Sequence, residues 1–195
     1  MSDQLEATLR ENRSLLEILV RFHEIDLPEG WLVAGAIAQT VWNLSGGYPA
    51  DRGIKDADIV YYDADDLSAE TEAAHEARIR TLFAHLPTKL DVKNQARVHL
   101  WYAKVFGYSI APYISAAHAI ATFPTTATAI GVRRCTGGFE CCAPFGLDDL
   151  FGLVVRPNRV QITAPIYEAK VARWRPLWPH LTFLPWGEVG TVTGN

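Results

Sequence analysis

The segment KDADIVYY, from Lys55 to Tyr62, places two aspartates two residues apart at the head of an apolar, β-prone run. Side chains two residues apart on a strand point to the same face, so Asp56 and Asp58 should project together, about 7 Å apart. Two carboxylates this close repel each other unless a cation lies between them, and oxygen ligands suit Mg²⁺ or Mn²⁺. We interpret the segment as a metal-binding strand; the alternative is a strand end whose aspartates only face water.

A third carboxylate, Asp91, lies in a similar short run, KLDV, after the helix breaker Pro87. If the two strands pair side by side, Asp56, Asp58 and Asp91 can gather around two metal ions. One ion would activate an attacking hydroxyl, and the other would hold the leaving phosphates.

The composition of the chain, 195 residues with 49% apolar and 21% charged side chains, is that of an ordinary folded protein with one good-sized core. No apolar run reaches the roughly 20 residues that a membrane-spanning helix needs, and the N-terminus lacks the features of a signal peptide. We therefore expect a cytoplasmic protein with no membrane partner. The cysteines do not describe a disulfide framework, and we expect reduced thiols on a β-hairpin at Cys135, Cys141 and Cys142.

The charge is unevenly distributed along the chain. The net charge of −4 disfavours non-specific binding of nucleic acid by the protein as a whole and leaves a local contact possible. Between Asp51 and Glu76, nine acidic residues face only Arg52 and Lys55, whereas the chain from Arg133 onward is mildly basic. Such an arrangement would complement a substrate that carries both metal and phosphate.

The residues before the aspartate strand predict two helices and a strand. Apolar residues at helical spacing predict one helix over residues 3–23, and residues 31–34 predict a buried strand followed by a helix over 36–44. Gly35 between them has no Cβ and would let a phosphate approach the backbone amides at the helix N-terminus. The alternative is that Gly35 only makes a tight turn.

A helix from Ser68 to Leu86 separates the two aspartate strands, which permits a parallel pair or a mixed sheet. Beyond Asp91, a further helix is predicted over residues 93–106, with Lys93 and Arg97 in its first turns. Two cations beside a metal site suit an anionic substrate. The alternative, ordinary polarity at a helix start, is disfavoured because a helix start usually prefers acids. This helix is predicted to turn four apolar side chains inward: Val98, Tyr102, Val105 and Phe106.

The last third of the chain predicts short helices and one hairpin. Arg133 on the hairpin is a candidate ligand contact. Lys170 and Arg173 lie three residues apart and share a helix face, so they could bind phosphate, although solvated surface charge is the more common explanation. The predicted elements are a helix over 115–121, hairpin strands over 125–134 and 139–143, a helical turn over 146–152 and a helix over 165–174.

Six segments together resemble a bacterial family of nucleotidyltransferase-like proteins within the polymerase-beta-type nucleotidyltransferase superfamily: VAGAIAQTVWN, GIKDADIVYYD, LDVKNQARVHLWY, IATFPTTATAIGVR, APFGLDDLF and YEAKVARW. The resemblance implies an α+β fold, a small mixed β-sheet flanked by helices, with a smaller C-terminal α/β extension. It also implies that Asp56 and Asp58 bind both metals, while Asp91 binds the catalytic metal and helps deprotonate an acceptor hydroxyl. That hydroxyl would attack the α-phosphate of a nucleoside triphosphate and release pyrophosphate.

The sequence departs from the superfamily pattern at one turn. The superfamily usually has Gly-Gly or Gly-Ser before the helix, whereas this chain has Gly35-Ala36 and so lacks a serine hydroxyl that often contacts the triphosphate. Backbone amides could still serve. Contacts to the nucleotide or its phosphates are expected from Gly35, Ala36, Lys55, Lys93, Arg97 and Arg133.

These inferences predict one nucleotidyltransferase-like domain over residues 1–195, with a catalytic core over about 24–110 and a C-terminal lobe over about 111–195. The predicted activity is Mg²⁺- or Mn²⁺-dependent transfer of a nucleoside monophosphate from a nucleoside triphosphate to a hydroxyl of an unidentified acceptor. That acceptor is a small molecule, a nucleic acid end or a protein. The alternative, motivated by the Gly-Ala turn, is a non-catalytic nucleotide- or metal-binding regulatory module.

Overall fold

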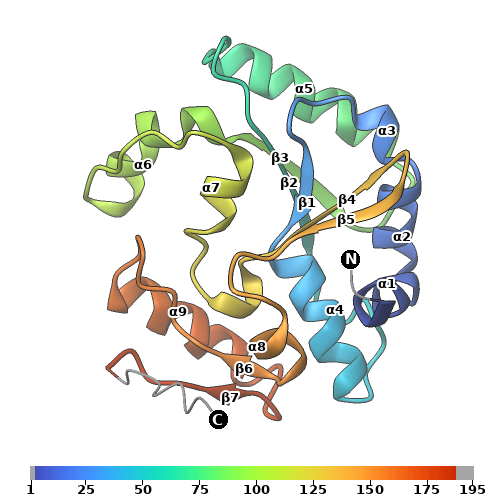
Figure 1. Ribbon diagram of the computed structural model, residues 1–195, viewed down its shortest axis with the longest axis vertical. Helices are drawn as coiled ribbons and strands as arrows, with labels where there is room; N and C mark the ends of the chain where they lie inside the picture. Colours follow the sequence, from blue (N-terminus) through green and yellow to red (C-terminus); the bar gives the residue numbers. More distant parts are fainter. Residues whose placement is uncertain (1–2, 188–195) are drawn as a thin grey trace.

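The fold is built on a five-stranded mixed β-sheet, shown with its flanking helices in the computed structural model of Figure 1, which describes residues 3–187. The strand order is β3-β2-β1-β4-β5. β2 and β3 run parallel, and the other neighbouring strands are antiparallel. The predicted α+β fold with a mixed sheet is confirmed. The strands are β1 (Trp31–Val33), β2 (Asp56–Tyr61), β3 (Lys89–Asn94), β4 (Gly131–Cys135) and β5 (Gly138–Cys142).

Helices cover both faces of this sheet, and a second small sheet of parallel β6 and β7 lies near the end of the described chain. Within residues 3–187, no helix is long and apolar enough to cross a lipid bilayer. The remaining elements are α1 (Asp3–Arg10), α2 (Arg13–Val20), α3 (Phe22–Ile25), α4 (Gly35–Ser45), α5 (Ala69–Leu82), α6 (Val98–Phe106), α7 (Ala116–Ile120), α8 (Asp148–Phe151), β6 (Val154–Val155), α9 (Ala164–Trp174) and β7 (Thr182–Phe183).

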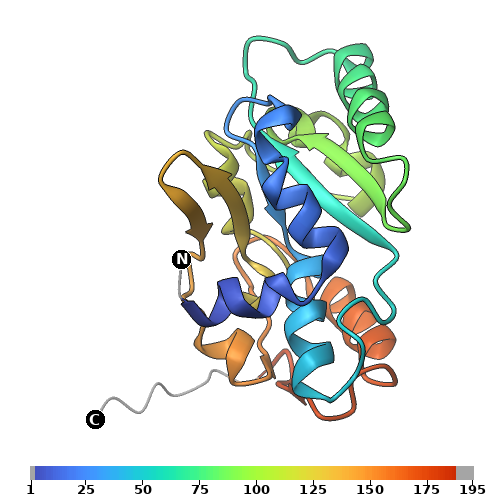
Figure 2. The ribbon, with the colours of Figure 1, turned by 90° about the vertical axis from the view of Figure 1, so that its right-hand side faces the viewer.

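Alternating residues of the strands contribute their side chains to two apolar layers, one on each face of the sheet. Leu32 and Ile59 belong to the main core, which they share with α1, α2 and α4; Figure 2 shows α1 and α2 in front of the strands. Trp31, Val33 and Val60 point to the other face and pack against α7 in a smaller cluster. Asp56 and Asp58 lie on this second face, because they alternate with the core residues of β2.

The helix predicted over residues 3–23 is three helices, so that prediction is wrong. The break lies at Asn12, whose side chain accepts a hydrogen bond from the backbone N–H of Leu15, 3.2 Å away, at the start of α2. The buried Asn12 amide also donates to Thr40 Oγ1 on α4 over 2.9 Å. Asparagine favours a helix cap over a helix interior, and here the cap also joins two helices.

The start of the hairpin also differs from prediction. Residues 126–128 form a 3₁₀ turn and not a strand, because Thr125 Oγ1 accepts the backbone N–H of Thr128 over 3.2 Å and caps the turn. The strand begins only at Gly131. The turn and the second hairpin strand lie where they were predicted, and the three cysteines are free thiols on β4 and β5, as expected.

The helix after Asp91 begins later than predicted. Lys93 belongs to β3, which continues to Asn94, and α6 begins at Val98 after a short 3₁₀ turn. Val105 was predicted to face inward but is 61% exposed, because the far end of α6 extends beyond the sheet. Phe106 is 39% exposed, although its ring packs against Tyr102 with the ring centroids 4.4 Å apart, and the inward prediction is confirmed for the buried Val98 and Tyr102.

The C-terminal helix α9 is held against α4 by tryptophans. Trp174 and Trp178 each meet Trp42 edge to face, with ring centroids 5.3 and 5.4 Å away. Trp178 Nε1 also donates to Asn43 Oδ1 over 2.7 Å, and both side chains are buried. This contact places α9 beside the N-terminal half of the chain, across from β2.

Candidate active site

The sheet register brings the predicted carboxylates to one face. Asp58 on β2 pairs with Asp91 on the parallel strand β3 and with Val33 on the antiparallel strand β1. Partners in register present their side chains to the same face, so Asp58 and Asp91 are neighbours there. Asp56 lies one step further along the same face of β2 and is exposed.

The environment of Asp58 disfavours its negative charge. Burial is the largest cause of the raised pKa of Asp58, and the neighbouring Asp56 and Asp91 carboxylates raise this pKa further, to about 6. Lys170 and Lys93 act in the opposite direction but do not cancel these effects. At neutral pH the Asp58 carboxylate therefore lies in a site with surplus negative charge, which a bound cation would relieve.

Asp91 forms ion pairs with two cationic side chains. Arg80 Nη2 on α5 and Lys93 Nζ on β3 both lie 3.5 Å from Asp91 Oδ1. Glu76 bridges the same two cations, at 2.5 Å from Arg80 and 2.7 Å from Lys93. Asp91 therefore belongs to a four-residue charge network at the edge of the sheet.

Asp56 and Asp58 fit one kind of metal site. Across residues 3–187, no three His, Cys, Asp or Glu side chains are arranged to hold a metal ion together, so an all-protein cage is not formed. Mg²⁺, however, is commonly bound by one or two carboxylates together with water and substrate phosphates. The oxygen-only pair on β2 and the surplus charge at Asp58 suit that arrangement.

The N-terminus of α4 opens beside the carboxylates. Ala34 precedes the helix with φ 57° and ψ −119°, and no side chain caps the first turn. Backbone N–H groups at a helix start form an anion site. At Gly35 an added Cβ would lie only 3.1 Å from Gln39 Nε2, so the missing side chain leaves the space in front of the helix open. Ala36 is instead buried in the core and does not line this space.

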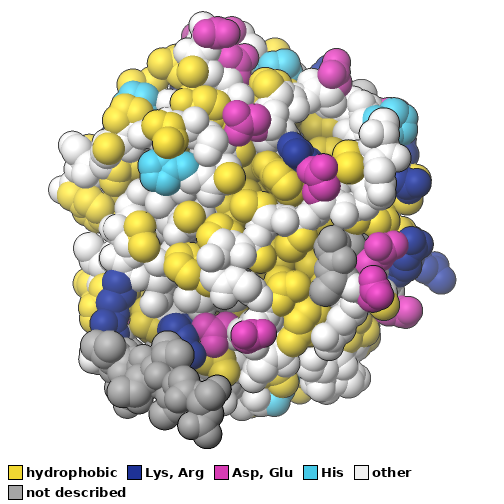
Figure 3. All heavy atoms as spheres, in the orientation of Figure 1, with side chains coloured by type: hydrophobic (Ala, Val, Ile, Leu, Met, Phe, Trp, Pro, Cys, Tyr) yellow, Lys and Arg dark blue, Asp and Glu magenta, His cyan; other side chains and the backbone are white. Residues whose placement is uncertain are grey.

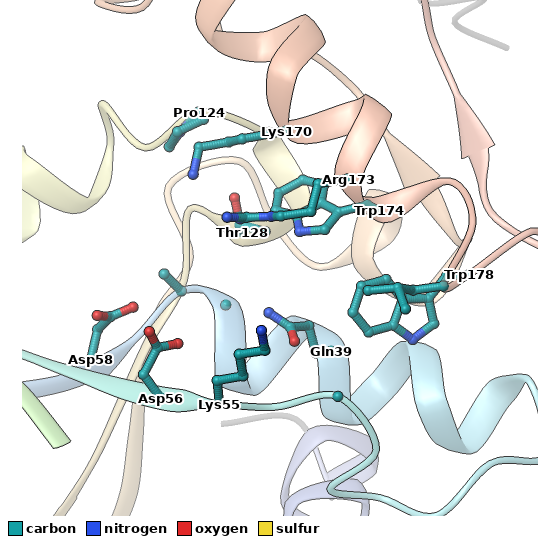
Figure 4. Close-up of a pocket in the computed structure, with 14 residues that line it drawn as sticks. Gln39, Lys55, Asp56, Asp58, Pro124, Thr128, Lys170, Arg173, Trp174 and Trp178 are labelled. Atoms are coloured by element: carbon teal, nitrogen blue, oxygen red, sulfur yellow. The ribbon is translucent and has the colours of Figure 1, made fainter. Parts of the chain in front are cut away.

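A polar cavity of about 390 Å³ connects this helix start with the carboxylate pair. Figure 4 shows Asp56 and Asp58 at one side, Lys55 and Gln39 below, and Lys170 and Arg173 reaching in from α9. Burial lowers the pKa of Lys170, and the nearby Arg173 lowers it further. The polar cavity is lined by Ala34, Gly35, Gln39, Gly53, Lys55, Asp56, Asp58, Pro124, Thr128, Lys170, Arg173, Trp174, Leu177 and Trp178.

An aromatic cavity of about 410 Å³ lies on the other side of Asp58. Ala34, Asp58, Pro124 and Lys170 line both cavities and form the boundary between them. Asp91 and Lys93 border the aromatic cavity at the sheet. Its other walls come mainly from α6, from the segments before and after α7, and from the start of α9 with the segment before it, and they include Val98, Trp101, Tyr102, Phe106, Tyr113, Gln161, Ile162 and Ile166.

The structure does not bring two of the predicted phosphate contacts to either cavity. Arg97 is buried and pairs with Glu72 at 2.5 Å. Arg133 lies on β4, pairs with Glu140 at 2.7 Å and stacks over the ring of Trp31 at 4.1 Å. Both side chains form local ion pairs away from the predicted aspartates.

Among the cavity residues that were not predicted contacts are Gln39, Lys170 and Arg173. The spacing of Lys170 and Arg173 placed them on one helix face, but solvated surface charge was the preferred explanation. Only the packing of α9 on α4 turns that face toward the aspartates. Gln39 lies one turn after Gly35 on α4 and faces the same cavity.

Comparisons with known proteins agree with this geometry. The model of a nucleotidyltransferase family matches residues 20–183, and the chain belongs to that family. A structure solved by NMR and described as revealing a CCA-adding enzyme head domain is similar, with a TM-score of 0.74 and 25% identity over 95% of this chain and 96% of that one. No curated protein matches the chain. Family membership and fold support nucleotidyl transfer, with a nucleoside triphosphate as substrate.

Proposed function

We propose that this protein is a metal-dependent nucleotidyltransferase that moves a nucleoside monophosphate from a nucleoside triphosphate to a hydroxyl of an acceptor. The observation that carries the proposal is the polar cavity, where an uncapped helix start and cationic side chains face a pair of carboxylates. Phosphates bind at helix starts and cationic side chains, and a divalent cation binds at carboxylates. The two groups are adjacent, as transfer at an α-phosphate requires.

The phosphate-binding groups come from two elements on opposite sides of the polar cavity. The backbone N–H groups at the start of α4 would donate hydrogen bonds to the terminal phosphates, as helix starts do in other phosphate sites. Lys55 precedes β2, while Lys170 and Arg173 reach across from α9. These side chains would stabilise the negative charge that grows on the leaving pyrophosphate.

The carboxylates would position the reacting groups. Asp56 and Asp58 would hold a divalent cation, which when bound lowers the pKa of the attacking hydroxyl and neutralises charge on the α-phosphate. Asp91, next to Asp58 in the sheet, would help to accept the hydroxyl proton. For that role Asp91 must exchange part of its contact with Arg80 and Lys93, each now 3.5 Å away.

A thermal-shift titration tests nucleotide binding. Wild type, Asp58→Asn and the control Asp65→Asn, an exposed aspartate in the loop after β2, are titrated with Mg²⁺ or Mn²⁺ and with ATP, GTP, CTP or UTP. We expect a metal-dependent rise in Tm with at least one nucleotide, lost in Asp58→Asn and kept in Asp65→Asn. No shift of the wild type with any pair would refute the proposal.

Transfer itself requires all three carboxylates. Asp56→Asn, Asp58→Asn and Asp91→Asn should each lower the rate of pyrophosphate release by on the order of a hundredfold to a thousandfold, while Asp65→Asn stays at the wild-type rate. Circular dichroism confirms that each variant is folded. A variant that keeps full activity removes its residue from the mechanism.

The second candidate is a non-catalytic nucleotide-binding module, and the ion pairs that occupy Asp91 favour it. It predicts tight nucleotide binding and no pyrophosphate release with any acceptor. In that case Asp91→Asn would leave nucleotide affinity unchanged, whereas Asp58→Asn would still reduce it.

A further inference from the structure

We propose that the aromatic cavity binds the acceptor, and that the acceptor is a small molecule with a flat apolar body and a free hydroxyl. This inference rests on the proposed function, because it names the substrate of the same site. It starts from the position of Asp58, which lines both cavities.

The direction of attack assigns one cavity to each substrate. In phosphoryl transfer the attacking and leaving oxygens lie roughly in line, on opposite sides of the phosphorus. The helix start and the cations Lys55 and Arg173 place the leaving pyrophosphate in the polar cavity. With the α-phosphate beside Asp58, the attacking hydroxyl must come from the other side, where Asp91 borders the aromatic cavity.

The walls of the aromatic cavity suit a rigid, apolar ligand. Tyr113 Oη pairs with Thr122 Oγ1 at 3.0 Å and with the Gln161 amide at 2.7 Å, so the ring is fixed in place. Tyr102 Oη meets Tyr108 Oη at 3.1 Å. With the phenol hydroxyls satisfied by the protein, the ring surfaces of this cavity are left to contact a ligand.

The size and charge of the aromatic cavity disfavour a nucleic acid end. Its volume of about 410 Å³ is that of a small-molecule site. A polynucleotide needs a row of cations along its backbone. The two cations that line this cavity, Lys93 and Lys170, lie beside the carboxylates, and Lys93 is paired with Glu76. Figure 3 shows few charged side chains over α6, on the left of the view.

The test uses defined aromatic alcohols. Wild type with Mg²⁺ and a nucleotide labelled at the α-phosphate is offered phenethyl alcohol, naphthyl ethanol, glycerol or a single-stranded RNA oligomer, and labelled product is measured. We expect the aromatic alcohols to be labelled with a kcat/KM roughly tenfold or more above that of glycerol. Preferential labelling of RNA, equal use of glycerol, or no labelling of either aromatic alcohol overturns the inference.

Variants on α6 connect this preference to the cavity. Trp101→Ala and Phe106→Ala should raise the KM for the aromatic alcohol roughly tenfold while the Kd for the nucleotide stays unchanged. The matched control is Leu100→Ala, because Leu100 is 58% exposed on the same helix and does not line the cavity. If both cavity variants behave like Leu100→Ala, the inference is wrong.

Ligand-observed NMR separates this inference from the proposed function. Naphthyl ethanol should bind the wild type and Leu100→Ala but not Trp101→Ala, even without nucleotide. If no nucleotide binds, the proposed function fails, and this measurement still decides whether the aromatic cavity accepts such a molecule. Absence of binding to the wild type overturns the inference while leaving nucleotide binding untouched.

Discussion

Asp58 lines both cavities, and its negative charge lowers the stability of the folded chain. The pKa of Asp58 is raised to about 6, above the ordinary value of about 4, so the folded state holds this proton more tightly than the unfolded state. Ionisation of Asp58 between about pH 4 and pH 6 therefore disfavours folding. Stability that protonated Asp58 provides at low pH is lost as the pH rises through about 6.

We predict that Asp58→Asn stabilises the metal-free protein in a pH-dependent way. Near pH 4 the two proteins should have similar Tm values, and above about pH 7 the variant should be more stable by about 1 kcal/mol, or 2–4 °C in Tm. The measurement is thermal unfolding with EDTA across this range. A gain that shrinks as the pH rises would contradict the charge repulsion described here.

Ala34 holds a backbone conformation that favours glycine. Its φ of 57° and ψ of −119° lie outside the regions that L-residues with a Cβ usually adopt. We predict that Ala34→Gly stabilises the fold by about 1 kcal/mol, whereas Ala77→Gly, at an exposed position inside α5, destabilises it by a similar amount. Urea unfolding of both variants measures this; equal losses in the two would show that Ala34 is not strained.

At the scale of the elements, α9 turns its cations toward the polar cavity. Replacing Lys170 removes a charge that faces the cavity where we propose that the phosphates bind, so Lys170→Met should raise the KM for the nucleotide roughly tenfold or more. Lys104→Met is the control, because Lys104 is exposed on α6 and lines neither cavity. Steady-state kinetics with both variants decides the point, and equal KM values would exclude Lys170 from phosphate binding.

The sequence predicted the elements that local patterns define. Alternation around Asp56 and Asp58 and the helix start at Ser68 each depend on neighbours within a few residues. Those predictions are confirmed. The break at Asn12 was missed because the apolar spacing runs on past it; its cap to Leu15 is local, and only its second contact, to Thr40, lies 28 residues away.

The candidate site was predictable only in part for the same reason. The Asp58 and Asp91 pairing follows from two strands and a crossover helix, which local patterns suggest. Lys170 reaches the aspartates only because α9 packs on α4, through contacts such as Trp178 to Asn43, 135 residues apart. Arg133 has the positive charge that a phosphate contact needs, but it pairs with Glu140 on the neighbouring strand and stacks over the ring of Trp31, away from the candidate site.

At the scale of the whole molecule, the Trp178 to Asn43 hydrogen bond joins the C-terminal segment to α4. Trp42 offers a matched control, because its buried Nε1 has no hydrogen-bond partner within the described chain. We predict that Trp178→Phe destabilises the protein by about 1–3 kcal/mol more than Trp42→Phe does, because only Trp178→Phe leaves a buried acceptor unpaired. Equal losses in chemical denaturation would assign the contact to ring packing alone.

The boundary of Ala34, Asp58, Pro124 and Lys170 between the two cavities also bears on the order of kinetic events. In the proposed reaction, pyrophosphate would form in the polar cavity and the finished adduct in the aromatic cavity, so the two products would not share one chamber. Neither product would then block the departure of the other, which predicts random product release. Added pyrophosphate would then compete with the nucleotide while leaving the entry of the acceptor free.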